Sequence, residues 1–146
     1  MPNEFNRLAE RLSRRTSRMG DRVSQAVRRA AITVDQVVVL MTPVDTGRAR
    51  SNWIATINIP ASGTREPFFS GNNLGLAERA NAQASIQAAQ TVIATYTQNS
   101  TIFITNNLEY IGELERGKSP QAPTGMVSFA IEAGRSTLAS VRLLEG

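Results

Sequence analysis

The chain changes from helix to strand within one short segment, Thr42-Pro43-Val44-Asp45-Thr46-Gly47-Arg48-Ala49-Arg50-Ser51-Asn52-Trp53. Pro43 ends the preceding helix, because the residue before a proline is pushed out of the helical region. The Asp45 side chain can accept hydrogen bonds from N–H groups two or three residues on, and Gly47 can adopt a positive φ. The segment therefore predicts a helix stop, a capped turn with a short helical turn over residues 48–52, and a strand that starts at Trp53.

Upstream of this segment, residues 4–41 predict one long amphipathic helix, with Gly20 as a candidate break. Its apolar residues recur at spacings of three, four and seven, and at about 100° per residue they share one face. They are Phe5, Leu8, Leu12, Met19, Val23, Val27, Ala30, Val34, Val37 and Met41. The opposite face carries the arginine stripe, Arg7, Arg11, Arg14, Arg15, Arg18, Arg22 and Arg29.

Charge is concentrated at this end of the chain. Residues 1–30 hold eight arginines against three acidic residues, a net charge of +5, whereas the remainder holds eight basic and nine acidic residues, a net charge of −1. Three interpretations of the arginine stripe stay open: a solvated helix face, a surface for DNA, whose phosphates favour clustered arginine, and a contact with an acidic partner ring. Membrane binding is not expected, because the apolar face lacks tryptophan and carries small residues.

Downstream, the sequence alternates short strands with helices. Strands are predicted over residues 53–59 and 101–105, and helices over 74–95, 110–116 and 126–144. The expected apolar faces are Leu76, Ala80, Ala84, Ile86 or Ala88, and Val92 or Ile93 for the first long one, and Val127, Ala130, Ile131, Leu138, Val141 and Leu144 for the last. Residues 60–73 and 118–125 are rich in Pro, Gly and polar residues, and we expect both loops to contact neighbouring subunits or an adjacent ring.

These elements predict an α+β fold in a single domain, residues 1–146, with residues 1–30 as its arginine-rich helical segment. A small, mostly antiparallel sheet should pack against two further helices and part of the first. Because two strands alone make a marginal sheet, we expect an extra strand from residues 60–73 or from a neighbouring subunit.

Composition argues against an enzyme. The chain has neither cysteine nor histidine, so thiolate and histidine metal sites and a Ser-His-Asp triad are excluded. We expect no catalytic residues, no cofactor and no metal. No signal peptide is visible, and the run from Val37 to Met41 is far below the roughly 20 apolar residues that span a bilayer. These features predict synthesis and use in the cytosol.

One pattern could suggest nucleotide binding. Residues 112–119, Gly-Glu-Leu-Glu-Arg-Gly-Lys-Ser, fit the phosphate-loop pattern G-x-x-x-x-G-K-[ST]. However, Pro123 would break the first turns of the helix that such a loop must open, and two glutamates would face the phosphate oxygens. The strand–loop–helix context is missing, so we expect no ATP binding.

Two segments carry a resemblance that covers most of the chain, roughly residues 30–145. The segment at 42–53 is followed by Asn106-Asn107-Leu108-Glu109-Tyr110-Ile111-Gly112-Glu113-Leu114-Glu115-Arg116-Gly117 and then by Gln121-Ala122-Pro123-Thr124-Gly125-Met126-Val127. In this order they resemble the tail-completion (tail-terminator, head–tail joining) proteins of long-tailed bacteriophages. Glu109 stands where that family often has proline, so the following turn should be more helical here.

The resemblance implies a structural virion protein and not an enzyme. It implies a homo-oligomeric ring, six-fold to match the tail tube, that caps the tube and joins it to the filled head. Its partners would be the tail-tube protein and a head-side connector or stopper protein, with non-specific contact to genomic DNA. Its location would be the neck of the virion, after assembly in the host cytoplasm. Two alternatives stay open: a head-side neck (stopper) protein, and a small cytosolic nucleic-acid-binding module that uses the arginine stripe.

The candidate interface residues lie in and near the two segments: Asp45, Thr46, Gly47, Arg48, Arg50, Trp53, Phe68, Phe69, Tyr110, Glu113, Glu115, Gly117, Ala122 and Pro123. Trp53 either packs in the core or forms a subunit contact, since it buries a large area in both cases. Residues 110–117 are either a surface turn of helix or an interface element in which Glu113 and Glu115 face a neighbour's arginines.

Overall fold

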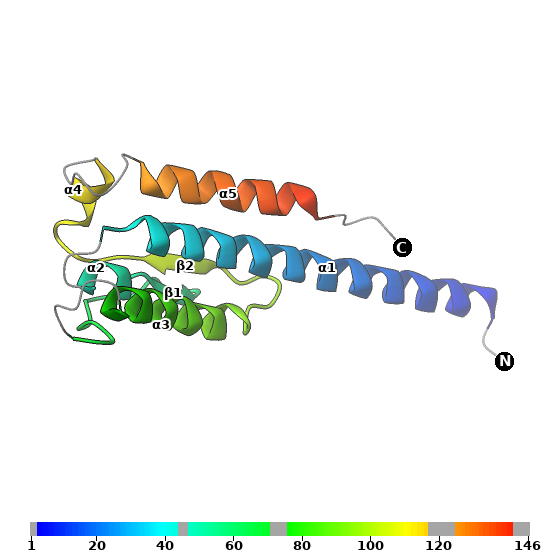
Figure 1. Cartoon of the computed structure of the whole chain (residues 1–146). Helices are drawn as coiled ribbons and strands as arrows, with labels where there is room; N and C mark the ends of the chain where they lie inside the picture. Colours follow the sequence, from blue (N-terminus) through cyan, green and yellow to red (C-terminus); the bar gives the residue numbers. More distant parts are fainter. Residues whose placement is uncertain (1–2, 44–46, 71–75, 117–124, 142–146) are drawn as a thin grey trace.

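The computed structural model describes residues 3–43, 47–70, 76–116 and 125–141. Within these ranges the elements are α1 (Glu4–Met41), α2 (Arg48–Ser51), β1 (Ile54–Ile57), α3 (Leu76–Ile93), β2 (Ile102–Thr105), α4 (Ile111–Glu115) and α5 (Met126–Ser140). The predicted α+β class is confirmed, with a long N-terminal helix and an antiparallel sheet packed together with further helices (Figure 1).

Helix α1 is continuous, so the break considered at Gly20 does not occur. The Asn3 side chain caps its first turn by accepting from Asn6 N, and Thr42 adopts an extended conformation at its C-terminal end, directly before Pro43. A Cβ atom at position 20 would lie 1.9 Å from Nε2 of Gln98. The Gln98 side-chain amide, from the turn that precedes β2, therefore packs directly on α1 at Gly20.

The sheet contains two described strands, β1 and β2, which pair antiparallel with Ala55 opposite Ile104. Both strands are shorter than predicted, because Asn58 adopts a left-handed conformation (φ 69°) directly after β1. The described part of the following loop, residues 60–70, forms no strand. The described part of this loop therefore does not supply the expected extra strand, and a strand from a neighbouring subunit stays a prediction.

The long helices lie side by side, with α1 between α5 and α3 (Figure 1). The inner face of the sheet, with Ala55, Ile102 and Ile104, packs against α3 at Ala89 and Ile93 and against the middle of α1. We expected α5 to cover the sheet as well, but it packs chiefly along α1. Gly134 allows this close packing, since a Cβ there would lie 2.5 Å from a Val34 methyl group.

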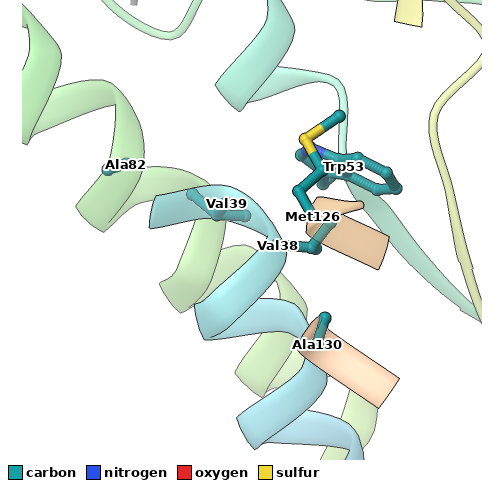
Figure 2. Close-up of a cluster of buried hydrophobic side chains, with 6 residues drawn as sticks. All are labelled: Val38, Val39, Trp53, Ala82, Met126 and Ala130. Atoms are coloured by element: carbon teal, nitrogen blue, oxygen red, sulfur yellow. The ribbon is translucent and has the colours of Figure 1, made fainter. Parts of the chain in front are cut away.

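A second cluster joins α1, α3, α5 and the residue before β1 (Figure 2). It contains Val38, Val39, Trp53, Ala82, Met126 and Ala130. Trp53 is buried, and its Nε1 donates to the Thr42 hydroxyl at 2.8 Å. The core alternative for Trp53 is therefore the correct one within the single chain.

Two details of the predicted helix faces were wrong. The buried face of α3 runs through Asn81, Ala82, Ser85, Ala89 and Ile93, and not through the line of alanines at 80, 84 and 88. Two of these buried residues are polar, so hydrophobic periodicity could not reveal the face. Helix α5 ends at Ser140 because Val141 is extended, and Leu144 lies outside the described residues.

Candidate assembly surfaces

The described parts of the two segments that carry the resemblance lie together at one end of the molecule (Figure 1). Asn106 links them, because its side-chain amide donates to the Ala49 carbonyl at 3.0 Å and its Oδ1 accepts from Leu108 N. Ile111 and Leu114 of α4 pack against the cluster that contains Trp53. Segments about sixty residues apart in the sequence are thus held together by both polar and apolar contacts.

Gly47 and Arg50 serve the fold of this region. Gly47 has a φ of 73° and precedes α2, as its place in the predicted turn suggested. Arg50 donates to the carbonyl oxygens of Thr42 (2.9 Å) and Leu40 (3.2 Å), and so caps the C-terminal end of α1. Burial lowers the pKa of Arg50, against an opposing attraction from Glu78. Asp45 and Thr46 lie outside the described residues.

A polar network around Asn81 fixes the loop that carries Phe68 and Phe69. The Asn81 amide accepts from the Ser51 hydroxyl and from Phe69 N, and donates to the Phe69 carbonyl, all at 2.9 Å. The Arg65 guanidinium donates to the Ser51 carbonyl and stacks 4.4 Å from the Phe68 ring centroid. Both phenylalanines remain partly exposed, on a loop that the chain holds in place.

Asp35 is an unexpected feature of α1. It is only 1% exposed, and neither carboxylate oxygen has a hydrogen-bond partner among the described residues. Burial raises the pKa of Asp35 from 3.8 to about 7, although the Arg65 charge acts in the opposite direction. Partial burial of the Arg65 guanidinium lowers the pKa of Arg65, against the attraction of Asp35. Asp35 is thus a buried acid that is half-protonated near neutral pH.

The α4 region contains the remaining described candidates. Tyr110 precedes the helix and is partly exposed, and Glu113 is exposed. The Glu115 carboxylate accepts from Val127 N at 3.0 Å, so it caps the start of α5 within the same chain. Residues 111–115 are helical, unlike the start of a phosphate loop. Gly117, Ala122 and Pro123 lie outside the described residues.

The N-terminal half of α1 projects beyond every other labelled element (Figure 1). Its apolar residues are exposed, from 81% at Phe5 to 41% at Val23. Residues spaced by eleven share a helix face, so Leu12 and Val23 repeat the position of Val34, which packs on α5. Helix α5 therefore covers only the C-terminal half of one continuous apolar stripe.

The arginine stripe points mostly away from the core, as predicted, and all of it except Arg29 lies on or next to this projecting half. Arg7, Arg11, Arg14, Arg15, Arg18 and Arg29 are exposed, and Arg22 is half-buried. The Glu10–Arg14 ion pair at 3.9 Å is exposed and contributes little to stability. Arg28, which is not part of the stripe, donates to the Tyr96 carbonyl and joins α1 to the turn before β2.

The described residues contain no group of three or more acidic, cysteine or histidine side chains that could hold a metal ion. Among the helices that the structure describes, none is both long and apolar enough to cross a membrane. Comparison with known proteins gave no matching family model, curated protein or solved structure.

Sequence reasoning missed four structural residues: Asp35, Asn52, Arg65 and Asn81. Asn52 exchanges two hydrogen bonds with the Arg65 backbone, both at 2.8 Å. No spacing rule connects these residues. Asn52 and Asn81 bond to backbone groups of the loop at 60–70, and Arg65 of that loop bonds to the Ser51 carbonyl. Asp35 has no hydrogen-bond partner among the described residues. The one available signal was an acid, Asp35, within the apolar run of α1.

Proposed function

We propose that this chain is a structural virion protein of a long-tailed bacteriophage, which forms a ring that caps the tail tube and joins it to the filled head. The resemblance of residues 42–53 and 106–127 to the tail-completion family motivates the proposal. The contact between these two segments supports it, because a shared motif made of distant segments is expected to specify one structural unit.

The observation that carries an assembly role is the projecting half of α1. A stripe of large apolar side chains in water invites association, and its opposite face presents a dense positive charge. Such a helix suits a part that becomes buried or neutralised in a larger particle. Rings form when a head-to-tail contact between copies closes on rotation, so one such contact, repeated between copies, is enough to build a ring.

Purification and imaging of the chain test this proposal. After nuclease treatment, we expect sedimentation velocity to show a defined oligomer and negative-stain images to show rings. Antibody labelling of tails that lack heads then separates the two neck positions. Label on the end of the tail that joins the head indicates a tail terminator, whereas label confined to filled heads indicates a stopper.

The exposed arginine stripe favours a second candidate, a small nucleic-acid-binding module. This candidate predicts a monomer or dimer that binds duplex DNA, with an affinity that falls steeply as salt increases. A chain that stays monomeric without DNA and shows this salt dependence would contradict the ring proposal and support the module.

A further inference from the structure

Strand β2 has one edge that the sheet leaves unpaired. Asn58 N donates to Thr101 O at 2.7 Å, and Thr56 lies opposite Phe103. Hydrogen-bonded and non-hydrogen-bonded pairs alternate in an antiparallel ladder. Phe103 and Thr105 therefore direct their backbone groups toward β1, whereas Ile102 and Ile104 direct theirs away from it. No described backbone group bonds to these outward groups of Ile102 and Ile104.

An apolar groove with a volume of about 540 Å³ lies beside this edge. Its floor is α1 between Val27 and Val34, one wall is β2, and the other wall is α5. Ile131 and Leu138 of α5 line the groove and are each 45% exposed, although they belong to the apolar face of their helix. The groove therefore combines apolar walls with backbone donors and acceptors that no described backbone group pairs.

We propose that the groove binds an extended arm of a different protein, acidic at its end, which adds a third strand to the sheet at β2. A helix keeps its backbone groups internal and would leave those of Ile102 and Ile104 unpaired. An extended chain pairs with them and, at about 3.3 Å per residue, about four of its residues match the length of β2. The inference rests on the sheet edge and is independent of the proposed function.

The chain itself does not offer a suitable strand among its described residues. The irregular segment at 58–70 contains Pro60 and Pro67, which suit a strand poorly. Its Arg65 donates to the carbonyls of Ser51 and Trp53, which lie next to β1 and not β2. A second copy of the chain is also a poor occupant. If the β2 edges of two copies paired antiparallel, both α1 helices would lie on the same face of the joined sheet, where they would compete for the groove. A single arm from another protein avoids this conflict.

Charge specifies the end of the arm. At Val27 the groove opens toward the N-terminal half of α1, within the region whose net charge is +5. Arg135 lines the groove with a side chain that is 74% exposed, next to Glu132 at 3.6 Å. An arm that leaves the groove on this side passes a positive surface, so acidic residues are favoured there.

A synthetic peptide tests strand addition to the purified chain. The probe is Asp-Val-Thr-Val-Thr-Val-Asp, and the measurement is amide hydrogen exchange at Ile102 and Ile104, with Phe103 as the internal reference. At saturating peptide we expect about tenfold or greater protection of both isoleucine amides and no change at Phe103. A version with lysine at both ends should bind more weakly.

Backbone methylation of the peptide separates strand addition from general apolar binding. In an antiparallel sheet, the two residues of a hydrogen-bonded pair have their side chains on the same face. Peptide residues that pair with Ile102 and Ile104 therefore place their side chains in the groove and direct their N–H groups to β2. In the bound peptide these residues are the valines. Methylation of the valine nitrogens should abolish protection, whereas methylation of the threonine nitrogens should preserve it. Equal effects of the two modifications would overturn the proposal.

Two matched substitutions on α5 locate the site. Ile131→Glu puts a charge on the groove wall and should abolish peptide binding. Phe129→Glu changes a residue of the same helix that is 57% exposed and does not line the groove, and it should bind normally. No protection in the unmodified protein would contradict the proposal, as would binding that survives Ile131→Glu.

Other occupants give distinct results. Protection without peptide that grows with protein concentration would identify a second copy as the occupant. Protection in the monomer that disappears when residues 142–146 are removed would identify the chain's own terminus. Each of these results would overturn the assignment to a different protein.

Discussion

At the residue scale, Asp35 makes the stability of the fold depend on pH. Its folded-state pKa of about 7 lies above the ordinary value of 3.8, so the folded state binds the proton more tightly than the unfolded state. The stabilisation is complete below the ordinary pKa and is lost as pH rises through about 7. With about 1.4 kcal/mol for each pKa unit, the total loss is a few kcal/mol.

Asp35→Asn should therefore raise the melting temperature at pH 8 and change it much less at pH 5. Thermal unfolding at both pH values measures this difference. Asp21→Asn is the matched control, because Asp21 lies on the exposed face of the same helix. An Asp35→Asn effect that is equal at pH 5 and pH 8 would show that the carboxyl does not titrate in this range.

Gly47 gives a second residue-scale prediction. Gly47 and Gly63 both have positive φ, but a Cβ at Gly47 would lie 2.4 Å from the Asn81 amide nitrogen, whereas Gly63 has open space. Gly63→Ala should cost about 1 kcal/mol through backbone strain alone. Gly47→Ala should cost more, by about 1–3 kcal/mol, because Asn81 must move and give up hydrogen bonds. Equal losses in urea unfolding would remove the steric part of this explanation.

The same residues show what the sequence could specify. A positive φ at Gly47 follows from local turn chemistry, so the turn was predictable. The collision with Asn81, and the burial of Asp35 and Asn81, depend on chain segments that meet only in the folded molecule. Turn chemistry along the sequence therefore predicted the conformation of Gly47, but it gave no information about the contact between Gly47 and Asn81.

At the element scale, helices were predicted more accurately than their packing. The boundaries of α1 followed from periodicity and Pro43, because both signals are local. The position of α5 along α1 did not follow, since the apolar face of α5 fits a sheet or a helix equally well. Ile131 and Leu138 belong to the apolar face of α5, and the described chain covers them only in part.

The α1–α5 contact depends on Gly134. Gly134→Ala should destabilise the protein by about 1–3 kcal/mol, because the new methyl group must displace Val34 or move the helices apart. Gly112→Ala in α4 is the control, since the nearest atom to its Cβ would be the end of the Arg116 side chain at 3.9 Å. That change should be neutral or slightly stabilising, as alanine favours helix. Chemical unfolding of the two variants would show whether Gly134 has this role.

At the scale of the whole molecule, α1 divides into an inner part that organises the core and an outer part, residues 4–19, whose side chains are all exposed. Leu8 and Leu12 belong to the outer part and are more than half exposed. Their joint replacement by Gln should change stability by no more than about 0.5 kcal/mol for each residue, as for other exposed positions. If the apolar stripe is an assembly surface, the same variant should fail to form the proposed oligomer. Normal assembly would show that this stripe is not used.

The arginine stripe of α1 can be tested on its own, with the apolar stripe of the same helix left unchanged. Replacement of Arg11, Arg14, Arg18 and Arg22 by Gln should leave folding intact, because Gln retains good helix propensity. If the chain has the proposed virion role and the stripe faces DNA, the variant should lower infectious-particle yield or DNA retention. In titrations with duplex DNA it should also reduce the slope of log affinity against log salt by about 0.9 for each lost phosphate contact.

If the stripe faces an acidic ring, particle yield falls while any DNA affinity of the purified chain keeps its slope. A solvated face predicts normal yield and an unchanged slope, so particle counts and salt titrations together distinguish the three roles.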